Sequence, residues 1–253
     1  MARRRVKTTK LDIIRHVTTV FLESGYSASS TKQIADDLDI GTGNLTYYFP
    51  TKEHLLAVLV DMLCDFQWKM MEKEADDGLS SIMAICLELT TMAVMCEVDE
   101  AARDFYISSY SSPMCLEIIR KNDTARAKEV FREYCPNWTD EQFAEAEALV
   151  SGVEYATLMT AGNPASLEIR IAGALNTILQ IYQIPAEVRK MKIDRVLGMD
   201  YRAISARVLM EFKQFVSEPT SRLWKNCMKQ KESSDLKTER FYPILYSPRR
   251  NYL

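Results

Sequence analysis

Side chains that can hydrogen-bond to a large ligand are concentrated in one short segment, at Thr42, Asn44, Thr46 and Tyr47. An asparagine amide can pair with adenine through two hydrogen bonds, a threonine offers thymine a hydroxyl and a methyl group, and a tyrosine can reach a phosphate. Gly43 lacks a side chain, so the backbone can come close to the ligand there. The segment therefore suits contacts in the major groove of DNA.

The sequence gives little support for catalysis or metal binding. His16 and His54 are the two histidines of the chain, so a histidine-based metal site or triad has no members elsewhere. Neither GxxxxGK[ST] nor GxGxxG occurs. We expect no enzyme activity, no catalytic residues, no metal and no cofactor; a mechanism based on a lone cysteine or glutamate is the remaining enzymatic alternative.

The segment lies in the third of three predicted helices. A capping box formed by Thr9 and Asp12 starts the first helix, which ends before Gly25. A second helix over 31–38 is followed by a tight turn and a short helix over 42–49, the outline of a helix-turn-helix. We expect its core to contain Phe21, Ile34, Leu38, Ile40, Leu45, Phe49 and Leu55.

A longer pattern runs through these helices, in the stretches 21–26, 30–35 and 43–55. Their glycine, aromatic and lysine positions resemble, in register, the DNA-binding domain of the TetR/AcrR family of transcriptional regulators. The resemblance implies that Thr31 and Lys32 touch phosphates at the start of the second helix. It implies base or backbone contacts in the third helix and phosphate contacts from Tyr48 and Lys52. The implied DNA-binding residues are Thr31, Lys32, Thr42, Gly43, Asn44, Thr46, Tyr47, Tyr48 and Lys52.

Three positions depart from the family pattern. Thr46 stands where the family usually has a tyrosine, which removes an aromatic phosphate contact. Asp39 replaces the usual turn glycine, although aspartate tolerates turn geometry. Gly41 replaces the usual capping serine or threonine, and we expect Thr42 to supply that cap instead.

The rest of the chain reads as further long helices. It contains only 8 glycines and 8 prolines, fewer than strand-rich folds require, and we find no strand pattern. We predict an all-α fold: a basic arm over 1–8, a three-helix DNA-binding domain over 9–54, a helical effector-binding and dimerisation domain over 55–217, and a flexible tail over 218–253. The predicted helices of the larger domain are 52–73, 79–98, 99–110, 113–135, 139–160, 167–184, 185–198 and 201–217.

Charge separates the same regions. Residues 1–54 carry a net charge of +2, residues 55–217 carry −9 and residues 218–253 carry +4. This asymmetry favours contact with a polyanion at the N-terminal end. The start of the chain lacks a signal-peptide core, the apolar stretch 79–98 is interrupted by Glu88, and the cysteines show no CxxC spacing. We therefore expect a cytoplasmic protein with reduced thiols and no membrane contact.

Small residues form a stripe on the helix predicted over 139–160. They are Ala144, Ala148, Gly152 and Ala156, each four residues from the next. Such a stripe lets another helix approach closely. Since the family usually dimerises through two late helices of each chain, we expect this helix and 167–184 to form a homodimer interface. The alternative is that the stripe packs internally and that 201–217 takes part in the dimer.

The middle helices are rich in methionine, cysteine and tyrosine, which suit both an irregular core and an adaptable pocket. By resemblance, an effector binds inside this domain, and polar groups on apolar helix faces could orient it. The candidate effector-binding residues are Glu88, Met92, Tyr106, Tyr110 and Tyr155.

The leading hypothesis is a transcriptional regulator, expected to be a repressor, that binds palindromic operator DNA as a homodimer and is released by a small apolar effector. A DNA-binding adaptor or architectural protein without a small-molecule ligand is the alternative. An enclosed cavity in the helical domain would count against that alternative.

Overall fold

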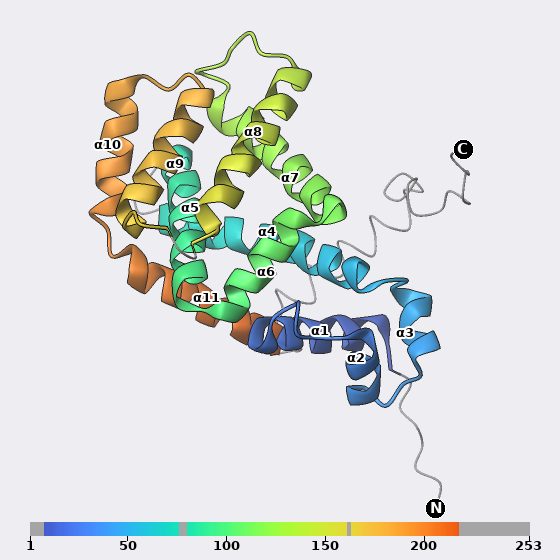
Figure 1. The fold of residues 1–253 in the computed structure, drawn as a ribbon. Helices are drawn as coiled ribbons and strands as arrows, with labels where there is room; N and C mark the ends of the chain where they lie inside the picture. The colour runs from blue at the N-terminus through green and yellow to red at the C-terminus, as the bar shows by residue number, and fades with distance from the viewer. Residues whose placement is uncertain (1–7, 76–79, 161–162, 218–253) are drawn as a thin grey trace, which may run out of the picture.

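The computed structural model describes residues 8–75, 80–160 and 163–217, and within these ranges the chain forms eleven α-helices and no strand (Figure 1). The predicted all-α fold is confirmed. The arm before Thr8 and the predicted tail over 218–253 lie outside the described residues. The helices are α1 Lys10–Ser24, α2 Thr31–Asp37, α3 Thr42–Tyr48, α4 Lys52–Ala75, α5 Ser81–Val98, α6 Glu100–Ser111, α7 Pro113–Phe131, α8 Asp140–Leu158, α9 Leu167–Ile181, α10 Ala186–Leu197 and α11 Tyr201–Ser217.

Side-chain caps account for most helix starts. The Thr9 hydroxyl accepts a hydrogen bond from the Asp12 backbone N–H at 3.2 Å, and the Asp12 carboxylate accepts one from the Thr9 N–H at 2.9 Å, so the predicted capping box is present. Thr139 and Gln142 form the same arrangement before α8. These caps satisfy backbone donors that a helix cannot satisfy itself.

Two predicted helix ends are wrong. α7 ends at Phe131 and not near Cys135, because the backbone N–H groups of Tyr134 and Cys135 turn back to the Phe131 carbonyl. α9 ends at Ile181 and not at Ile184, because Gln183 adopts a positive φ of 58° and reverses the chain. The helical pattern of apolar residues continues through both ends, so it conceals these turns.

Helices α1 to α3 and the start of α4 form a small head at one end of the molecule (Figure 1). Phe21, Ile34, Leu45 and Leu55 are buried in its core, with at most 1% of each exposed, whereas Leu38 and Ile40 are half-buried. The turn between α2 and α3 passes through Asp39 at a φ of 50°, the geometry expected at this position.

The larger body is built around α5. This helix is long and apolar enough to cross a membrane by length and composition, yet 72% of it is buried inside the molecule. It contacts every other helix of the body from α4 to α11, and so it is the central helix of the body's core. Its apolar residues therefore pack in the interior of the molecule.

Polar contacts join the head to the body. The Asp104 carboxylate on α6 accepts hydrogen bonds from the Ser27 backbone N–H at 2.7 Å and from the Ser27 hydroxyl at 2.5 Å. The hydroxyl of Ser112, just after α6, donates to the Glu53 carboxylate on α4. The loop between α1 and α2 and the first turn of α4 are therefore both attached to α6.

Gly25 makes this junction possible. Its φ is 86° and its ψ is 155°, a region essentially restricted to glycine, and a Cβ there would lie 2.8 Å from an Asp104 carboxylate oxygen. Gly25→Ala should therefore lower the free energy of unfolding by roughly 2 kcal/mol. Gly43→Ala is the matched control, because a Cβ at Gly43 would meet nothing within 4 Å. Urea unfolding measures both, and equal stability of the two variants would contradict the prediction.

Candidate DNA interface and effector cavity

The third helix of the head presents its polar residues to solvent. Leu45 is fully buried and fixes the rotation of α3, which leaves Thr42, Asn44, Thr46 and Tyr47 exposed, the last by 80%. The backbone at Gly43 is also exposed. These residues therefore share a surface that is open to a large ligand.

The start of α3 differs from the prediction. Gly41 is the residue that precedes the helix, and no side chain caps the free backbone N–H groups there. Thr42 is the first helical residue and does not supply the expected cap. The first turn of α3 thus leaves backbone donors available, and these are the groups that hydrogen-bond phosphates at helix starts.

The expected phosphate contacts lie in different environments. Lys32 on α2 is exposed, whereas Thr31 and Tyr48 are half-buried. The Lys52 ammonium donates to the Ser29 carbonyl at 2.7 Å and lies 4.0 Å from the centre of the Tyr26 ring. Burial lowers the pKa of Lys52, although Asp104 opposes this shift. In this structure, therefore, Lys52 binds the loop that precedes α2.

The two histidines have structural partners in the head. His16 lies 3.2 Å from the Asp37 carboxylate, and the His54 ring lies 2.7 Å from the Thr51 hydroxyl. Within the described ranges, no three histidine, cysteine, aspartate or glutamate side chains gather in an arrangement that could hold a metal ion.

A cavity lies inside the body. Its volume, measured as the space open to the centre of a water molecule, is about 60 Å³, and α4 to α9 with the residue after α9 line it. Four candidate effector-binding residues, Glu88, Met92, Tyr106 and Tyr110, are in its lining. The fifth, Tyr155, does not line the cavity; it follows Glu154 on α8 and so points about 100° away around the helix.

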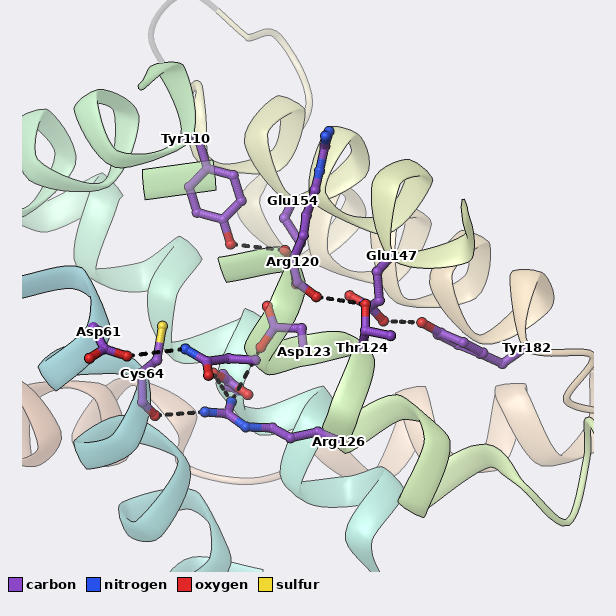
Figure 2. Close-up of polar contacts among 12 residues, drawn as sticks. Asp61, Cys64, Tyr110, Arg120, Asp123, Thr124, Arg126, Glu147, Glu154 and Tyr182 are labelled. Carbon is purple, nitrogen blue, oxygen red and sulfur yellow. Dashed lines mark hydrogen bonds and ion pairs between the residues drawn. The ribbon is translucent and has the colours of Figure 1, made fainter. Parts of the chain in front are cut away.

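The lining also contains charged residues that the sequence analysis missed. They are Asp123 and Arg126 on α7 and Glu147 and Glu154 on α8. Figure 2 shows the carboxyl groups of Asp123, Glu147 and Glu154 extending toward the same space between the helices. A signal was present, because Phe143, Glu147, Val150 and Glu154 follow helical spacing, which places two glutamates on the buried face of α8.

Two kinds of partner hold these carboxyl groups. Arg126 lies 3.5 Å from Glu88 and 3.4 Å from Asp123, and it donates to the Cys64 carbonyl at 2.9 Å. The phenol of Tyr110 donates to Glu154 at 2.8 Å (Figure 2).

Tyr182 provides the second phenol, which donates to Glu147 (Figure 2). Its ring stacks on Phe131 with a centroid distance of 3.9 Å and an interplanar angle of 8°. This packing holds the phenol in place, so an aromatic pair positions the partner of Glu147.

Burial dominates the ionisation of the cavity. It raises the pKa of Glu147 to about 7, although the hydrogen bond from Tyr182 opposes the shift. Burial, together with neighbouring carboxylates, also holds the pKa values of Asp123 and Glu154 well above their usual range. Burial raises the pKa of Glu88 as well, against the nearby Arg126. Burial therefore favours the protonated form of these carboxyl groups.

The small-residue stripe on α8 faces outward. Ala144, Gly152 and Ala156 are exposed, Ala148 is half-buried, and a Cβ at Gly152 would meet nothing within 4 Å. The stripe therefore does not pack against another described helix of the same chain. Leu149 on α8 is 54% exposed, and Ile169 on α9 is 64% exposed.

The raised pKa of Glu147 predicts a pH-dependent stability. Between pH 4.5 and about 7 the folded protein holds a proton that the unfolded chain has released, so rising pH favours unfolding. Ionisation of Glu147 therefore lowers the free energy of unfolding by roughly 3 kcal/mol across this pH range. Glu147→Gln should abolish this pH-dependent contribution. The variant should therefore be more stable than the parent at pH 8 and about as stable at pH 4.5.

Chemical denaturation at several pH values measures this effect. Glu145→Gln on the exposed side of α8 is the control, and its free energy of unfolding should depend on pH as that of the parent does. Parallel stability curves for the parent and Glu147→Gln would show that Glu147 does not titrate in this range.

Comparisons with known proteins address the head directly. Residues 13–59 match the family model described as bacterial regulatory proteins, tetR family. These residues include most of α1, all of α2 and α3, and the start of α4. No curated protein matches the sequence significantly.

Several solved structures resemble the chain at low identity. A gamma-butyrolactone receptor described as an ArpA-like protein is 16% identical, with a TM-score of 0.39 over 79% of this chain and 96% of that one. AmtR of Mycobacterium smegmatis is 17% identical, with a TM-score of 0.36 over 78% and 99%. The TetR family protein CprB from S. coelicolor A3(2) is 17% identical, with a TM-score of 0.39 over 79% and 95%.

The similarity to this family lies in the head, where the matched residues include the exposed face of α3 and the core that supports it. Residues 13–59, which form the helix-turn-helix head, are therefore similar to the tetR family of bacterial regulatory proteins.

Proposed function

We propose that the protein is a ligand-responsive transcriptional repressor that binds palindromic operator DNA as a homodimer and is released by a small effector. The observation that carries this proposal is that one helix, α6, both lines the cavity and holds the head. Tyr106 and Tyr110 of α6 line the cavity, while Asp104 of α6 binds Ser27 in the head.

Helix α4 provides a second connection. Its Val60, Leu63 and Cys64 line the cavity, and its first residues, Lys52 and Glu53, contact Ser29 and Ser112. An effector that shifts α4 or α6 would move the head. If DNA and effector favour different positions of the head, each lowers the affinity of the other, typically by ~1–3 kcal/mol.

The cavity also separates this proposal from the alternative of an adaptor without a small-molecule ligand. A fully packed interior would suit an architectural role, whereas this core leaves a hollow lined by polar and aromatic groups. The proposed domain division, with the head over 9–54 and the body over 55–217, places DNA binding and effector binding in different parts of the chain.

In the proposed DNA contact, Asn44 and Tyr47 read the major groove together with Thr42, Gly43 and Thr46. Thr31, Lys32 and Tyr48 contact phosphates. Lys52 supports the head through Ser29 and completes the phosphate contacts once that bond is exchanged. Two-fold symmetry would place the recognition helices in successive major grooves, roughly 34–36 Å apart.

Asn44→Ala tests the base-reading role. An asparagine that pairs with adenine contributes about 1–3 kcal/mol of discrimination per half-site. The ratio of the affinities for operator and scrambled DNA should therefore be at least tenfold lower in the variant than in the parent. The preferred sequence comes from selection out of a random DNA pool, and titration at fixed salt measures both affinities.

Asn137→Ala, an exposed substitution in the connection between α7 and α8, is the matched control and should leave this discrimination unchanged. An Asn44→Ala variant that discriminates as well as the parent would remove Asn44 from the base contacts.

The dimer is proposed to form through α8 and α9. Gly152→Arg places a long charged side chain on the exposed stripe and should convert dimers into monomers, with loss of operator binding. Ala206→Arg tests the alternative interface through α11, where Ala206 is exposed, and Ala125→Arg on α7 is a control. Sedimentation velocity measures all three; a dimeric Gly152→Arg variant together with a monomeric Ala206→Arg variant would move the interface to α11.

A further inference from the structure

The charges around the cavity are unbalanced. In the described part of the chain, four carboxyl groups and a single guanidinium line it. Arg126 is shared between Glu88 and Asp123, while the hydrogen-bond donors to Glu147 and Glu154 are the phenols of Tyr182 and Tyr110. A phenol can hydrogen-bond a carboxylate, but it does not neutralise its charge. The carboxyl groups that line the cavity therefore outnumber the positively charged groups that could balance them.

We propose that the cavity binds an organic cation, an amine or quaternary ammonium group attached to a small apolar portion. The inference takes the cavity as the effector site and so rests on the proposed function above. The cationic nitrogen would lie among Asp123, Glu147 and Glu154, and the apolar portion would lie against Met92, Phe105 and Ile178.

The hollow itself is the second observation behind the proposal. Acidic residues that only paired with one another would need no space between them. Here an open volume of about 60 Å³ lies between side chains that come from six helices. This is room for roughly four water molecules or one compact group, since one water needs ~10–15 Å³ on this measure. The acids are thus arranged around a space that a small ligand can occupy.

The rest of the lining favours an organic cation over a metal ion. No described cluster of three His, Cys, Asp or Glu side chains has the arrangement of a metal site. The wall is instead rich in aromatic rings, including Phe105, Tyr106, Phe131 and Tyr182. Ring faces attract quaternary ammonium groups, and methyl groups on nitrogen pack against apolar surface without needing hydrogen bonds.

The other effector classes fit the cavity less well. An anion would meet carboxyl groups from α5, α7 and α8 with one guanidinium to attract it. A purely apolar ligand, as the sequence predicted, would add neither a charge nor a hydrogen bond to the carboxyl groups that line part of the cavity. A cation with an apolar portion uses both parts of the lining.

Proton release should accompany binding. A cation favours the ionised form of the carboxyl groups, so protons leave them as the ligand enters. The other titratable groups that face the cavity are Arg126, Cys64 and the phenols of Tyr106, Tyr110 and Tyr182. Burial raises the pKa of the thiol and of all three phenols well above neutral, so at neutral pH the released protons come from the carboxyl groups.

The test uses the full chain without DNA and three permanent cations: tetramethylammonium, choline and benzyltrimethylammonium. The neutral isostere of choline, 3,3-dimethylbutan-1-ol, and the anion 3,3-dimethylbutanoate are the matched probes. Calorimetry at pH 7.5 should show at least one cation binding, and choline or a larger cation binding at least tenfold more tightly than the neutral isostere. In two buffers of different ionisation enthalpy the heats should differ, because quaternary ammonium groups cannot titrate and the protons must come from the protein.

Two conservative variants locate the charge. Glu154→Gln and Glu147→Gln should each weaken cation binding at least tenfold and leave binding of the neutral isostere within twofold, because both amides still accept the phenol hydrogen bonds. Glu145→Gln on the exposed side of α8 should change neither. Circular dichroism confirms that each variant is folded, and an unfolded variant is replaced by Asp123→Asn.

Several outcomes overturn the proposal. They are the absence of binding by every cation, equal affinity for choline and its neutral isostere, stronger binding of the anion, and cation affinity unchanged in both glutamine variants. Operator release then separates this inference from the proposed function. Release by a neutral or anionic compound alone would uphold the repressor and reject the cation, whereas cation binding without release would uphold the cation site and reject its role as the effector site.

Discussion

The seven-residue helix α3 can exist only because the head buries part of it. A helix of two turns is not stable in water by itself, since few backbone hydrogen bonds offset the cost of ordering it. Leu45 has no exposed surface, and the chain after α3 is held by Phe49, which is 3% exposed. The orientation of Asn44 and Tyr47 toward solvent follows from that burial. Everything proposed for DNA contact depends on this small core.

That core is continuous with the core of the body. The buried residues of α1, α2 and α3 belong to the same apolar cluster as those of α4, α5 and α6. Packed interiors transmit displacement because they have little free volume to absorb it. The polar contacts at Asp104 and Glu53 act in parallel with this packing. A cavity in the body is therefore a place from which a ligand can act on α3 without touching it.

Most of the fold followed from local patterns. Caps at Thr9 and Thr139 located helix starts, and the spacing of apolar residues located the helices. The ends at Phe131 and Ile181 could not be predicted, because they depend on turns such as Gln183 that no local signal marks. The exposed face of α3 was predictable from Leu45 alone. The cavity was not, because Glu88, Asp123 and Glu147 come from three helices, and only tertiary packing brings them together.

The acids in the cavity connect stability to ligand choice. A carboxyl group is costly to bury when charged, and protonation removes most of that cost. A group whose pKa lies near the ambient pH changes its ionisation almost freely, and Glu147, with a pKa of about 7, is in this position. Burial and neighbouring carboxylates also raise the pKa values of Asp123 and Glu154, so a ligand must supply free energy to ionise them. The same residues that weaken the empty protein as pH rises thus decide how much free energy a ligand gains from each charge that it places in the cavity.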